Sequence, residues 1–201
     1  MTDDKKRSSV PPDFAQMARN GVCSLPERAT NLRHRIFTAF ALLVLPFAAI
    51  AAEVPQIGQP APEFSLPSQE GGPVSLKDFR GQWVVLYFYP KDMTPGCTIE
   101  AHNFQRDLAK YEGQHAVILG VSVDSTDSHK EFCTKESLTF KLLSDTDKKM
   151  VDQYGSLGSH GVASRNTFLI DPAGKIARVW TGVIPAKHSE EVLAALSEAG
   201  K

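Results

Sequence analysis

The chain has 201 residues, of which 42% are hydrophobic and 22% are charged, and its formal net charge is −1. This length and composition fit one globular domain with a sizeable core and an additional segment. The near-zero charge offers no basic surface of the kind that binds nucleic acid. The three cysteines, Cys23, Cys97 and Cys133, are too few for a disulfide-rich scaffold, and they form no zinc-binding pattern with the histidines. We therefore expect no nucleic-acid partner, no metal and no cofactor.

The first 52 residues differ in composition from the rest of the chain. A basic stretch at 31–35 precedes an uncharged, mostly apolar run at 36–52 that ends in small residues, and this order is typical of a secretory signal peptide. The run contains Pro46 and is shorter than the roughly 20 residues of a membrane-spanning helix, so an uncleaved membrane anchor is kept as the alternative. We predict a signal peptide with an N-terminal extension at 1–52 and a folded domain at 53–201. The protein would then be periplasmic or otherwise exported, without stable membrane association.

The domain is expected to begin irregularly and to continue with alternating strands and helices. The segment 58–72 is rich in proline and glycine, which predicts irregular backbone. Continuous apolar runs at 83–89 and 116–123 predict strands that are buried on both faces, as in parallel sheets. Between them, the apolar spacing of 96–112 predicts a helix. Four apolar residues can share a broad face of this helix: Ile99, Phe104, Leu108 and Tyr111.

The second half of the domain predicts shorter helices and a hairpin. The remaining elements are, in chain order, a helix at 127–137, a strand at 140–143, a helix at 147–154, strands at 166–170 and 175–180, and a helix at 189–199. The D-P-A-G turn between the last two strands is short enough for an antiparallel hairpin. This order predicts an α/β fold with a central mixed sheet flanked by helices. The thioredoxin fold has its elements in the same order.

The P-K-D-M-T-P-G-C-T-I-E segment after the first long strand carries the clearest chemistry. It places Cys97 in the first turn of a helix, where the helix dipole and unpaired backbone N–H groups favour a thiolate. Thr94 is the expected N-cap and Pro95 the first helical residue, and the Thr94 hydroxyl can turn toward the sulfur or toward a bound oxygen. Pro90 donates no N–H and is expected to act as an apolar shield. The segment predicts an activated sulfur nucleophile, with a buried structural cysteine as the alternative.

These residues carry a resemblance to a known family. Pro90, Thr94 and Cys97 match the P-x-x-x-T-x-x-C signature of peroxiredoxins, and the T-P-G-C-T-x-E form resembles the bacterioferritin-comigratory-protein, or Q-type, branch. The likeness extends from about Val54 to the C-terminus and includes the A-P-E-F and N-T-F-L-I-D sequences. It implies a thioredoxin-like fold and a thiol-dependent peroxidase that reduces hydrogen peroxide and organic hydroperoxides. Cys97 would be the peroxidatic cysteine, which peroxide oxidises to a sulfenic acid.

The resemblance also implies roles for residues around Cys97. Arg165, just before N-T-F, matches the active-site arginine of the family, whose permanent charge favours the thiolate and stabilises the departing oxygen. Thr94 and the backbone N–H of Cys97 would orient the peroxide oxygens. Glu100 matches the glutamate of the motif, and we predict that it supports the first helical turn and takes no part in acid–base catalysis. Without the family motif, Arg165 would be taken for a solvated surface residue.

The resemblance leaves the role of the second cysteine open. Many Q-type proteins carry the resolving cysteine five residues after the peroxidatic one, where this chain has His102. Another arrangement in this branch places it farther downstream, and Cys133 lies on the predicted helix at 127–137. Our hypothesis is that Cys133 forms an intramolecular disulfide with the oxidised Cys97. The alternative is that Cys133 is a small buried residue beside Phe132, and that an external thiol resolves a one-cysteine enzyme.

The expected partners and the competing functions follow from the same resemblance. A thioredoxin-like or glutaredoxin-like protein is the expected reductant. Q-type relatives are commonly monomeric, so we expect a monomer. A redox-sensing binding or holdase protein, with Cys97 as sensor only, is the competing class. A thiol–disulfide oxidoreductase would need C-x-x-C, and Thr94 stands at its first position. The histidines show no converging spacing, and five of them are predicted at the surface or in loose packing: His102, His115, His129, His160 and His188.

Overall fold

The computed structural model describes residues 53–200, and these residues follow the predicted order of strands and helices. The predicted signal peptide at 1–52, and Cys23 within it, lie outside the described residues. Between residues 53 and 200, no helix is long and apolar enough to cross a membrane.

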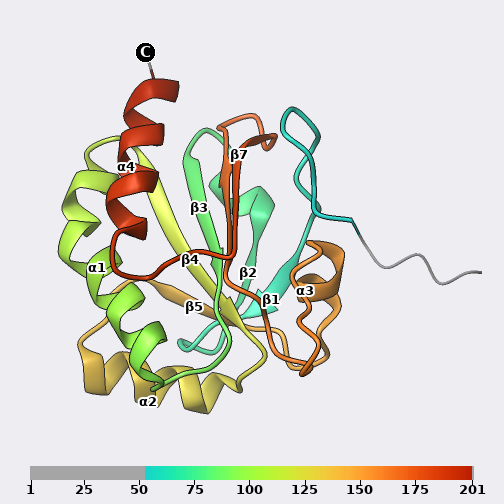
Figure 1. Cartoon of the computed structure of the whole chain (residues 1–201), viewed down its shortest axis with the longest axis vertical. Coiled ribbons are helices and arrows are strands. Elements are labelled where there is room, and N and C mark those ends of the chain that lie inside the picture. The colour runs from blue at the N-terminus through green and yellow to red at the C-terminus, as the bar shows by residue number, and fades with distance from the viewer. Residues whose placement is uncertain (1–52, 201) are drawn as a thin grey trace, which may run out of the picture. The chain divides into compact units, whose positions relative to one another are not determined.

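A five-stranded mixed sheet forms the centre of the domain (Figure 1). Its strands are β3 (Trp83–Phe88), β4 (Ala116–Ser122), β5 (Lys141–Ser144), β6 (Asn166–Ile170) and β7 (Ile176–Thr181). They lie in the order β5-β4-β3-β6-β7, with β3, β4 and β5 parallel and with β6 antiparallel to both β3 and β7. The central strand β3 is buried except at its first residue, as its continuous apolar run predicts. The α/β class, the mixed sheet and the hairpin are thus confirmed.

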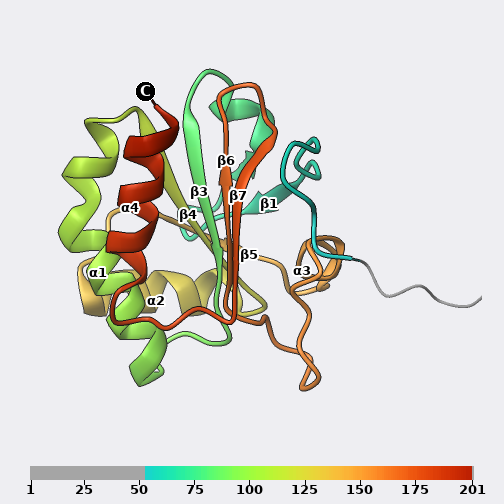
Figure 2. The same cartoon turned by 45° about the horizontal axis from the view of Figure 1, so that its top comes forward.

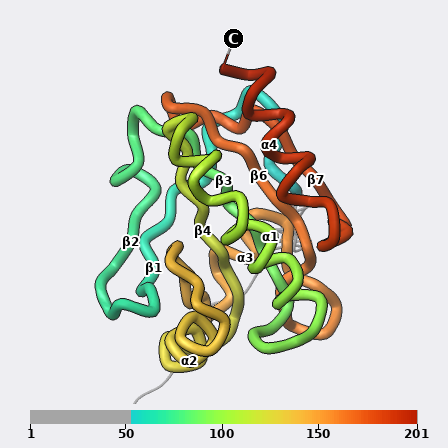
Figure 3. The backbone as a smooth tube through the Cα atoms, turned by 90° about the vertical axis from the view of Figure 1, so that its left-hand side faces the viewer, coloured from blue at the N-terminus to red at the C-terminus, as the bar shows by residue number. Residues whose placement is uncertain are grey.

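Helices cover both faces of this sheet. They are α1 (Pro95–Glu112), α2 (Thr126–Glu136), α3 (Lys149–Gln153) and α4 (His188–Ala199). Figures 1 and 2 show α1 and α4 side by side on one face and α3 on the other. In Figure 3, α1 and α4 lie in front of the strands, and α2 lies at the lower edge of the domain. The hydrophobic core has two parts. Residues of α1, α2 and α4 contribute to one part, and residues of α3 and the N-terminal segments contribute to the other.

The structure differs from the predicted elements in the N-terminal segment and on one face of α1. The segment that we expected to be irregular contains part of a small antiparallel sheet of β1 (Ser65–Pro67) and β2 (Pro73–Ser75). Strands of three residues are too short to show an alternating pattern. On α1, Ile99 is 49% exposed, whereas the carboxylates Glu100 and Asp107 are buried. The prediction for this face was partly wrong, because polar side chains can be buried when they have partners.

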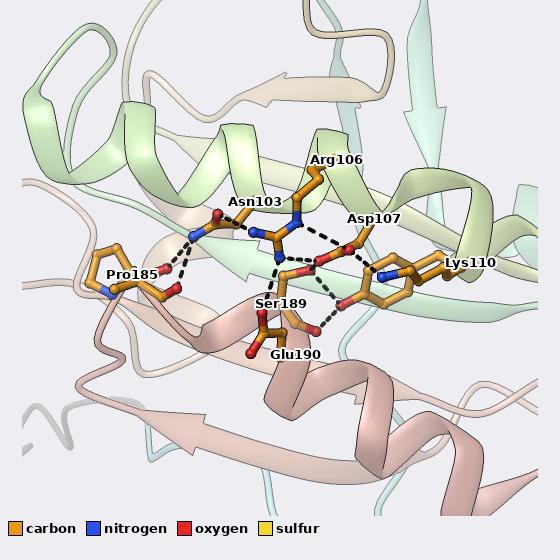
Figure 4. Close-up of polar contacts among 9 residues, drawn as sticks. Asn103, Arg106, Asp107, Lys110, Pro185, Ser189 and Glu190 are labelled. Atoms are coloured by element: carbon orange, nitrogen blue, oxygen red, sulfur yellow. Dashed lines mark hydrogen bonds and ion pairs between the residues drawn. The ribbon is translucent and has the colours of Figure 1, made fainter.

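Asp107 joins α1 to the beginning of α4 (Figure 4). Its completely buried carboxylate accepts hydrogen bonds from Arg106, from Lys110 Nζ at 2.8 Å and from Ser189 Oγ of α4 at 2.9 Å. Tyr111 Oη donates to the carbonyl of Ser189 at 2.7 Å. The hydrogen bond from Arg106 is the main reason why the pKa of Asp107 lies well below its usual range. These contacts hold α4 against the helix that carries the predicted nucleophile.

Candidate active site

Cys97 lies in the first turn of α1 and is 2% exposed. As predicted, Thr94 is the N-cap residue and Pro95 follows at the first helical position. The Thr94 hydroxyl makes no capping hydrogen bond; it lies 2.9 Å from Cys97 Sγ and 3.0 Å from the carbonyl oxygen of Lys91. The side chain of Thr94 therefore faces the sulfur, and only its backbone takes the N-cap position.

Both protonation states of the sulfur fit this arrangement of Thr94. A hydroxyl group has one proton to donate and can accept at the same time. Toward a thiolate, which only accepts, Thr94 donates that proton to Cys97 Sγ. Toward a neutral thiol, Thr94 Oγ1 accepts from the S–H group and donates to the carbonyl of Lys91. The hydroxyl can therefore stay in place while Cys97 loses its proton.

Arg165 approaches the sulfur from β6. This strand runs antiparallel to β3, with Tyr87 opposite Thr167, so the residue just before β6 lies near the end of β3 where α1 begins. Arg165 Nη2 is 3.3 Å from Cys97 Sγ. The carbonyl of Arg165 accepts a hydrogen bond from the N–H of Val183 at 3.0 Å, which fixes the backbone at this point. The guanidinium places a permanent positive charge beside the nucleophile.

Gly96 leaves the room that Arg165 needs. A Cβ atom at position 96 would lie 2.8 Å from Arg165 Nη2 and 3.6 Å from its Cζ, and contacts under 3.0 Å force a neighbour to move. The glycine of the T-P-G-C sequence thus permits the close approach of the guanidinium. We assigned Gly96 no role from the sequence. A glycine in the first turn of a helix, against its low helix propensity, was the available signal.

Glu100 contacts the guanidinium through its other terminal nitrogen. Arg165 Nη1 donates to Glu100 Oε2 at 2.7 Å, and the glutamate side chain is only 1% exposed. Its other oxygen, Oε1, has no hydrogen-bond partner among the described residues. Burial raises the pKa of Glu100 to about 7, and the charge of Arg165 opposes this shift. Glu100 therefore orients the guanidinium of Arg165. This role is more specific than the one we predicted, which was to support the first helical turn.

Cys133 lies on α2 and contributes to the same part of the core as Cys97. Its side chain is buried next to Phe132, and neither Cys97 nor Cys133 takes part in a disulfide in this structure. A groove beside it is lined by Gln69, Glu70, Lys130, Thr134, Leu138 and Thr139. Burial, followed by the negative charges of Asp92 and Glu70, raises the pKa of Cys133 to about 11.

Two of the histidines that we expected at the surface are completely buried. His129 of α2 and His188 at the beginning of α4 are both 0% exposed. His188 Nε2 lies 2.8 Å from the hydroxyl of Thr167, and His129 has polar partners at both ring nitrogens. The prediction was wrong for these two residues because it considered sequence spacing, which does not show polar partners from other elements.

Pro90 lies half-buried, directly after Tyr89, at the point where the chain leaves β3. Its role as an apolar shield stays a prediction.

Among residues 53–200, the histidine, cysteine and acidic side chains form no group of three that could hold a metal ion. The side chains gathered at the candidate site are therefore a thiol, a hydroxyl, a guanidinium and a carboxylate.

This set suits a sulfur nucleophile that attacks a small electrophile. When a thiolate attacks an O–O bond, negative charge develops on the departing oxygen. Arg165 and Thr94 already face the sulfur, so they can stabilise that charge without moving. The donors to Cys97 Sγ are thus two side chains, whereas the sequence had led us to stress the backbone N–H groups of the helix.

Comparisons with known proteins identify the family of the chain. Residues 57–179 match the AhpC/TSA family. Peroxiredoxin Bcp of Bacillus subtilis is 39% identical over 150 residues, which are 71% of this chain and 96% of that protein. The chain belongs to the AhpC/TSA family. Peroxiredoxin Bcp of Escherichia coli is likewise 39% identical, over 148 residues that cover 70% of this chain and 95% of the relative. The resemblance to the Q-type branch is thereby confirmed.

Solved structures of this branch share the fold. The bacterioferritin comigratory protein of Xanthomonas campestris, described for its alkyl peroxide reduction activity, superposes with a TM-score of 0.66 at 36% identity. The match covers 69% of this chain and 92% of that one. A mutant of PrxQ from Xylella fastidiosa gives a TM-score of 0.71 at 34% identity, covering 75% and 100%. The fold is thus the thioredoxin-like fold of peroxiredoxins, and the protein is a thiol-dependent peroxidase.

Proposed function

We propose that this peroxiredoxin reduces hydrogen peroxide and organic hydroperoxides, with Cys97 as the peroxidatic cysteine. The position of Cys97 Sγ, 2.9 Å from Thr94 Oγ1 and 3.3 Å from Arg165 Nη2, carries the assignment. The thiolate attacks the terminal oxygen of the peroxide and the O–O bond breaks. The electron pair of that bond leaves with the second oxygen, which takes up a proton to become water or an alcohol. Cys97 is left as a sulfenic acid.

Organic hydroperoxides are included for two reasons. The related protein of Xanthomonas campestris is described for alkyl peroxide reduction. In this chain, Ile99 and Ile184 expose apolar side chains, 49% and 76% accessible, on segments that adjoin the site. Ile99 lies on α1 just after Cys97. Ile184 precedes Pro185, and Pro185 lies near Gly96, since a Cβ atom at position 96 would be 3.9 Å from the proline ring. An alkyl group can pack against such side chains.

Cys133 is proposed to resolve the sulfenic acid. Its thiol condenses with oxidised Cys97, which forms a Cys97–Cys133 disulfide and releases water. Cys97 and Cys133 contribute to the same part of the core but lie on different helices, with no bond between them. A disulfide requires Cα atoms about 4.4–6.8 Å apart, so we propose that the helices move when it forms. Local unfolding of α2, of the first turn of α1 or of both supplies that movement. A thioredoxin-like or glutaredoxin-like dithiol then reduces the disulfide by exchange.

We further propose that the protein is an exported monomer. Export is supported by the signal-peptide pattern at 31–52. A monomer is proposed because Q-type relatives are commonly monomeric. An exported enzyme needs a periplasmic relay for its electrons, because cytosolic thioredoxin cannot reach it. N-terminal sequencing of the mature protein from separated cell fractions tests the cleavage, and light scattering tests the monomer.

Turnover of peroxide with a dithiol reductant tests the function. Cys97→Ser is expected to abolish activity, and retained activity would contradict the site. Cys133→Ser is expected to permit the first oxidation but no disulfide, as seen by non-reducing mass spectrometry after one equivalent of peroxide. Absence of the Cys97–Cys133 linkage in the parent protein would indicate a one-cysteine enzyme resolved by an external thiol. A single oxidation without turnover would indicate a redox-sensing binding or holdase protein.

A further inference from the structure

A buried polar cluster joins the peroxidatic loop, residues 89–94, to α2. Asp92 lies in this loop and is 6% exposed. Three side chains meet its carboxylate: Tyr89 Oη donates to Oδ1 at 2.7 Å, and Ser128 Oγ and His129 Nδ1 lie 2.7 and 2.8 Å from Oδ2. Tyr89 comes from the loop itself, whereas Ser128 and His129 belong to α2. One carboxylate therefore connects the loop with the helix.

The imidazole of His129 connects Asp92 with β5. Nε2 lies 3.2 Å from the carbonyl oxygen of Leu143 in β5, which can only accept. Nδ1 faces the Asp92 carboxylate, which already accepts from two hydroxyl groups. Burial acts to raise the pKa of Asp92, but the contacts with His129, Ser128 and Tyr89 together lower that pKa. His129 and Asp92 thus form a buried hydrogen-bonded pair, and removing one partner is costly because it leaves the other buried without it.

Asp124 holds the same loop from the connection between β4 and α2. Asp124 Oδ2 accepts a hydrogen bond from the backbone N–H of Asp92 at 2.9 Å and another from Ser122 Oγ at 2.8 Å. Met93, which follows Asp92 in the loop, has a φ of 57°, which is an unfavourable backbone conformation for a residue other than glycine. The loop conformation before Thr94 therefore depends on anchors outside the loop.

Cys133 lies one helical turn after His129, and both side chains are on the buried face of α2. While His129 keeps its partners, α2 remains seated and the thiol remains buried, with its pKa raised to about 11. A thiol in that state is a poor nucleophile. Opening of α2 exposes Cys133 and restores ordinary thiol reactivity, but it breaks the contacts between His129 and Asp92.

We propose that Asp92 and His129 form a latch that keeps α2 and the peroxidatic loop folded together and releases both when the Cys97–Cys133 disulfide forms. The proposal rests on the resolving role of Cys133. Asp92 and His129 are positioning residues, because they act through the loop and the helix and not on the sulfur. The closed latch favours the first oxidation, for which Thr94 must stay beside Cys97, and it delays resolution. It thereby sets how readily a second peroxide oxidises the sulfenic acid to sulfinic acid.

Single-turnover kinetics of His129→Gln test the latch, since glutamine keeps a side-chain donor but lacks the ring that contacts both Asp92 and Leu143. After one equivalent of hydrogen peroxide, timed thiol alkylation and mass spectrometry give the rates of Cys97 oxidation and of disulfide formation. We expect disulfide formation about tenfold faster and the first oxidation several-fold slower. We also expect a smaller sulfinic acid fraction at excess peroxide. A purely structural role would not move the two steps in opposite directions.

Ser128→Ala provides a graded variant that also serves if His129→Gln does not fold. It removes a neutral hydrogen bond to the same carboxylate, so it should change both rates in the same directions by smaller factors. Two controls break other contacts of α1. His102→Gln removes the half-exposed contact with Glu136 of α2 at 2.9 Å, and Tyr111→Phe removes a buried hydrogen bond to α4. Each control should change the disulfide rate by less than about twofold.

Amide hydrogen exchange measures the coupling directly. In His129→Gln, the amides of 126–136 and of 91–98 should exchange faster together, and faster exchange in α2 alone would contradict the latch. Equal disulfide rates in the parent and in His129→Gln would overturn the latch and leave the resolving role of Cys133 intact. Absence of the Cys97–Cys133 linkage in the parent would overturn that role and the proposed purpose of the latch with it.

Discussion

Arg165 Nη2 lies 3.3 Å from Cys97 Sγ, although the two residues come from elements far apart in the sequence. The antiparallel pairing of β6 with β3 brings them together. The same guanidinium donates to the buried carboxylate of Glu100 through Nη1 at 2.7 Å. One planar group therefore contacts the nucleophile and its own orienting partner at once. An ammonium group is a compact point charge and cannot make both contacts with this geometry.

Arg165→Lys is therefore expected to lower the second-order rate constant for peroxide by about 100-fold, which is typical for the loss of one donor to a developing oxyanion. Stopped-flow measurement of peroxide consumption gives this constant. Arg178→Lys, on the exposed part of β7, is the matched control and should react like the parent. A rate constant for Arg165→Lys within threefold of the parent value would show that only the positive charge matters.

Gly96→Ala should impair the reaction without unfolding the protein. The new methyl group would lie 2.8 Å from Arg165 Nη2, so the guanidinium has to move away from Cys97. We expect a fall of about tenfold in the rate constant for peroxide, with an unchanged circular dichroism spectrum. Gly72→Ala is the control, because a Cβ there meets nothing within 4 Å. Full activity in Gly96→Ala would mean that the guanidinium has room that the structure does not show.

Thr94→Val separates the shape of the threonine from its hydroxyl group. The two side chains have nearly the same volume, but valine cannot donate to Cys97 Sγ, which Thr94 Oγ1 contacts at 2.9 Å. We expect the rate constant for peroxide to fall by about 100-fold, while Thr94→Ser retains most of the activity. Equal losses in both variants would point to the methyl group, and thus to packing, as the important part of Thr94.

The local part of this site could be predicted from the sequence. A buried strand, an N-cap threonine and a proline at the first helical position place Cys97 in the first turn of α1 without any long-range information. Arg165 could be named only through the family motif, because its approach depends on the pairing of β6 with β3. Strand pairing between distant segments is not contained in local patterns.

The buried polar side chains of Asp92 and His129 escaped prediction for a different physical reason. Asp92 and His129 are polar residues, which are usually exposed, and burial is tolerated here because each supplies the partner of the other. Sequence spacing does not show such a pair across a loop and a helix. One hint was available: His129 shares its helix face with Phe132 and Cys133, so a helical wheel places it on the buried side.

Asp107→Asn should destabilise the protein more at neutral pH than in acid. The pKa of Asp107 is lowered in the folded state, so its ionised form contributes stability above its ordinary pKa of 3.8. That contribution is lost as the pH falls toward the folded-state value. We expect a loss of about 2 kcal/mol in the free energy of unfolding at pH 7, measured with urea, and a smaller loss at pH 3. Asp152→Asn, an exposed carboxylate on α3, should change little. A loss that does not depend on pH would show that shape and not charge matters at position 107.

Glu100 should give the opposite dependence on pH. Its pKa is raised from the ordinary 4.5 to about 7 because its side chain is buried. Between these two values the folded protein keeps a proton that the unfolded chain releases, so stability falls as the pH rises through this range. Glu100→Gln has no such proton. The free energy of unfolding of the parent should therefore decline relative to that of Glu100→Gln by about 2–3 kcal/mol from pH 5 to pH 8.

Urea unfolding of the reduced proteins at four pH values between 5 and 8 measures this difference. Glu112→Gln, an exposed glutamate at the end of α1, is the control and should run parallel to the parent. If Glu100→Gln also runs parallel to the parent, Glu100 is ionised throughout this range. The ion pair with Arg165 would then be strong enough to offset the cost of burying both charges, and the guanidinium would be held equally firmly at every pH at which the enzyme works.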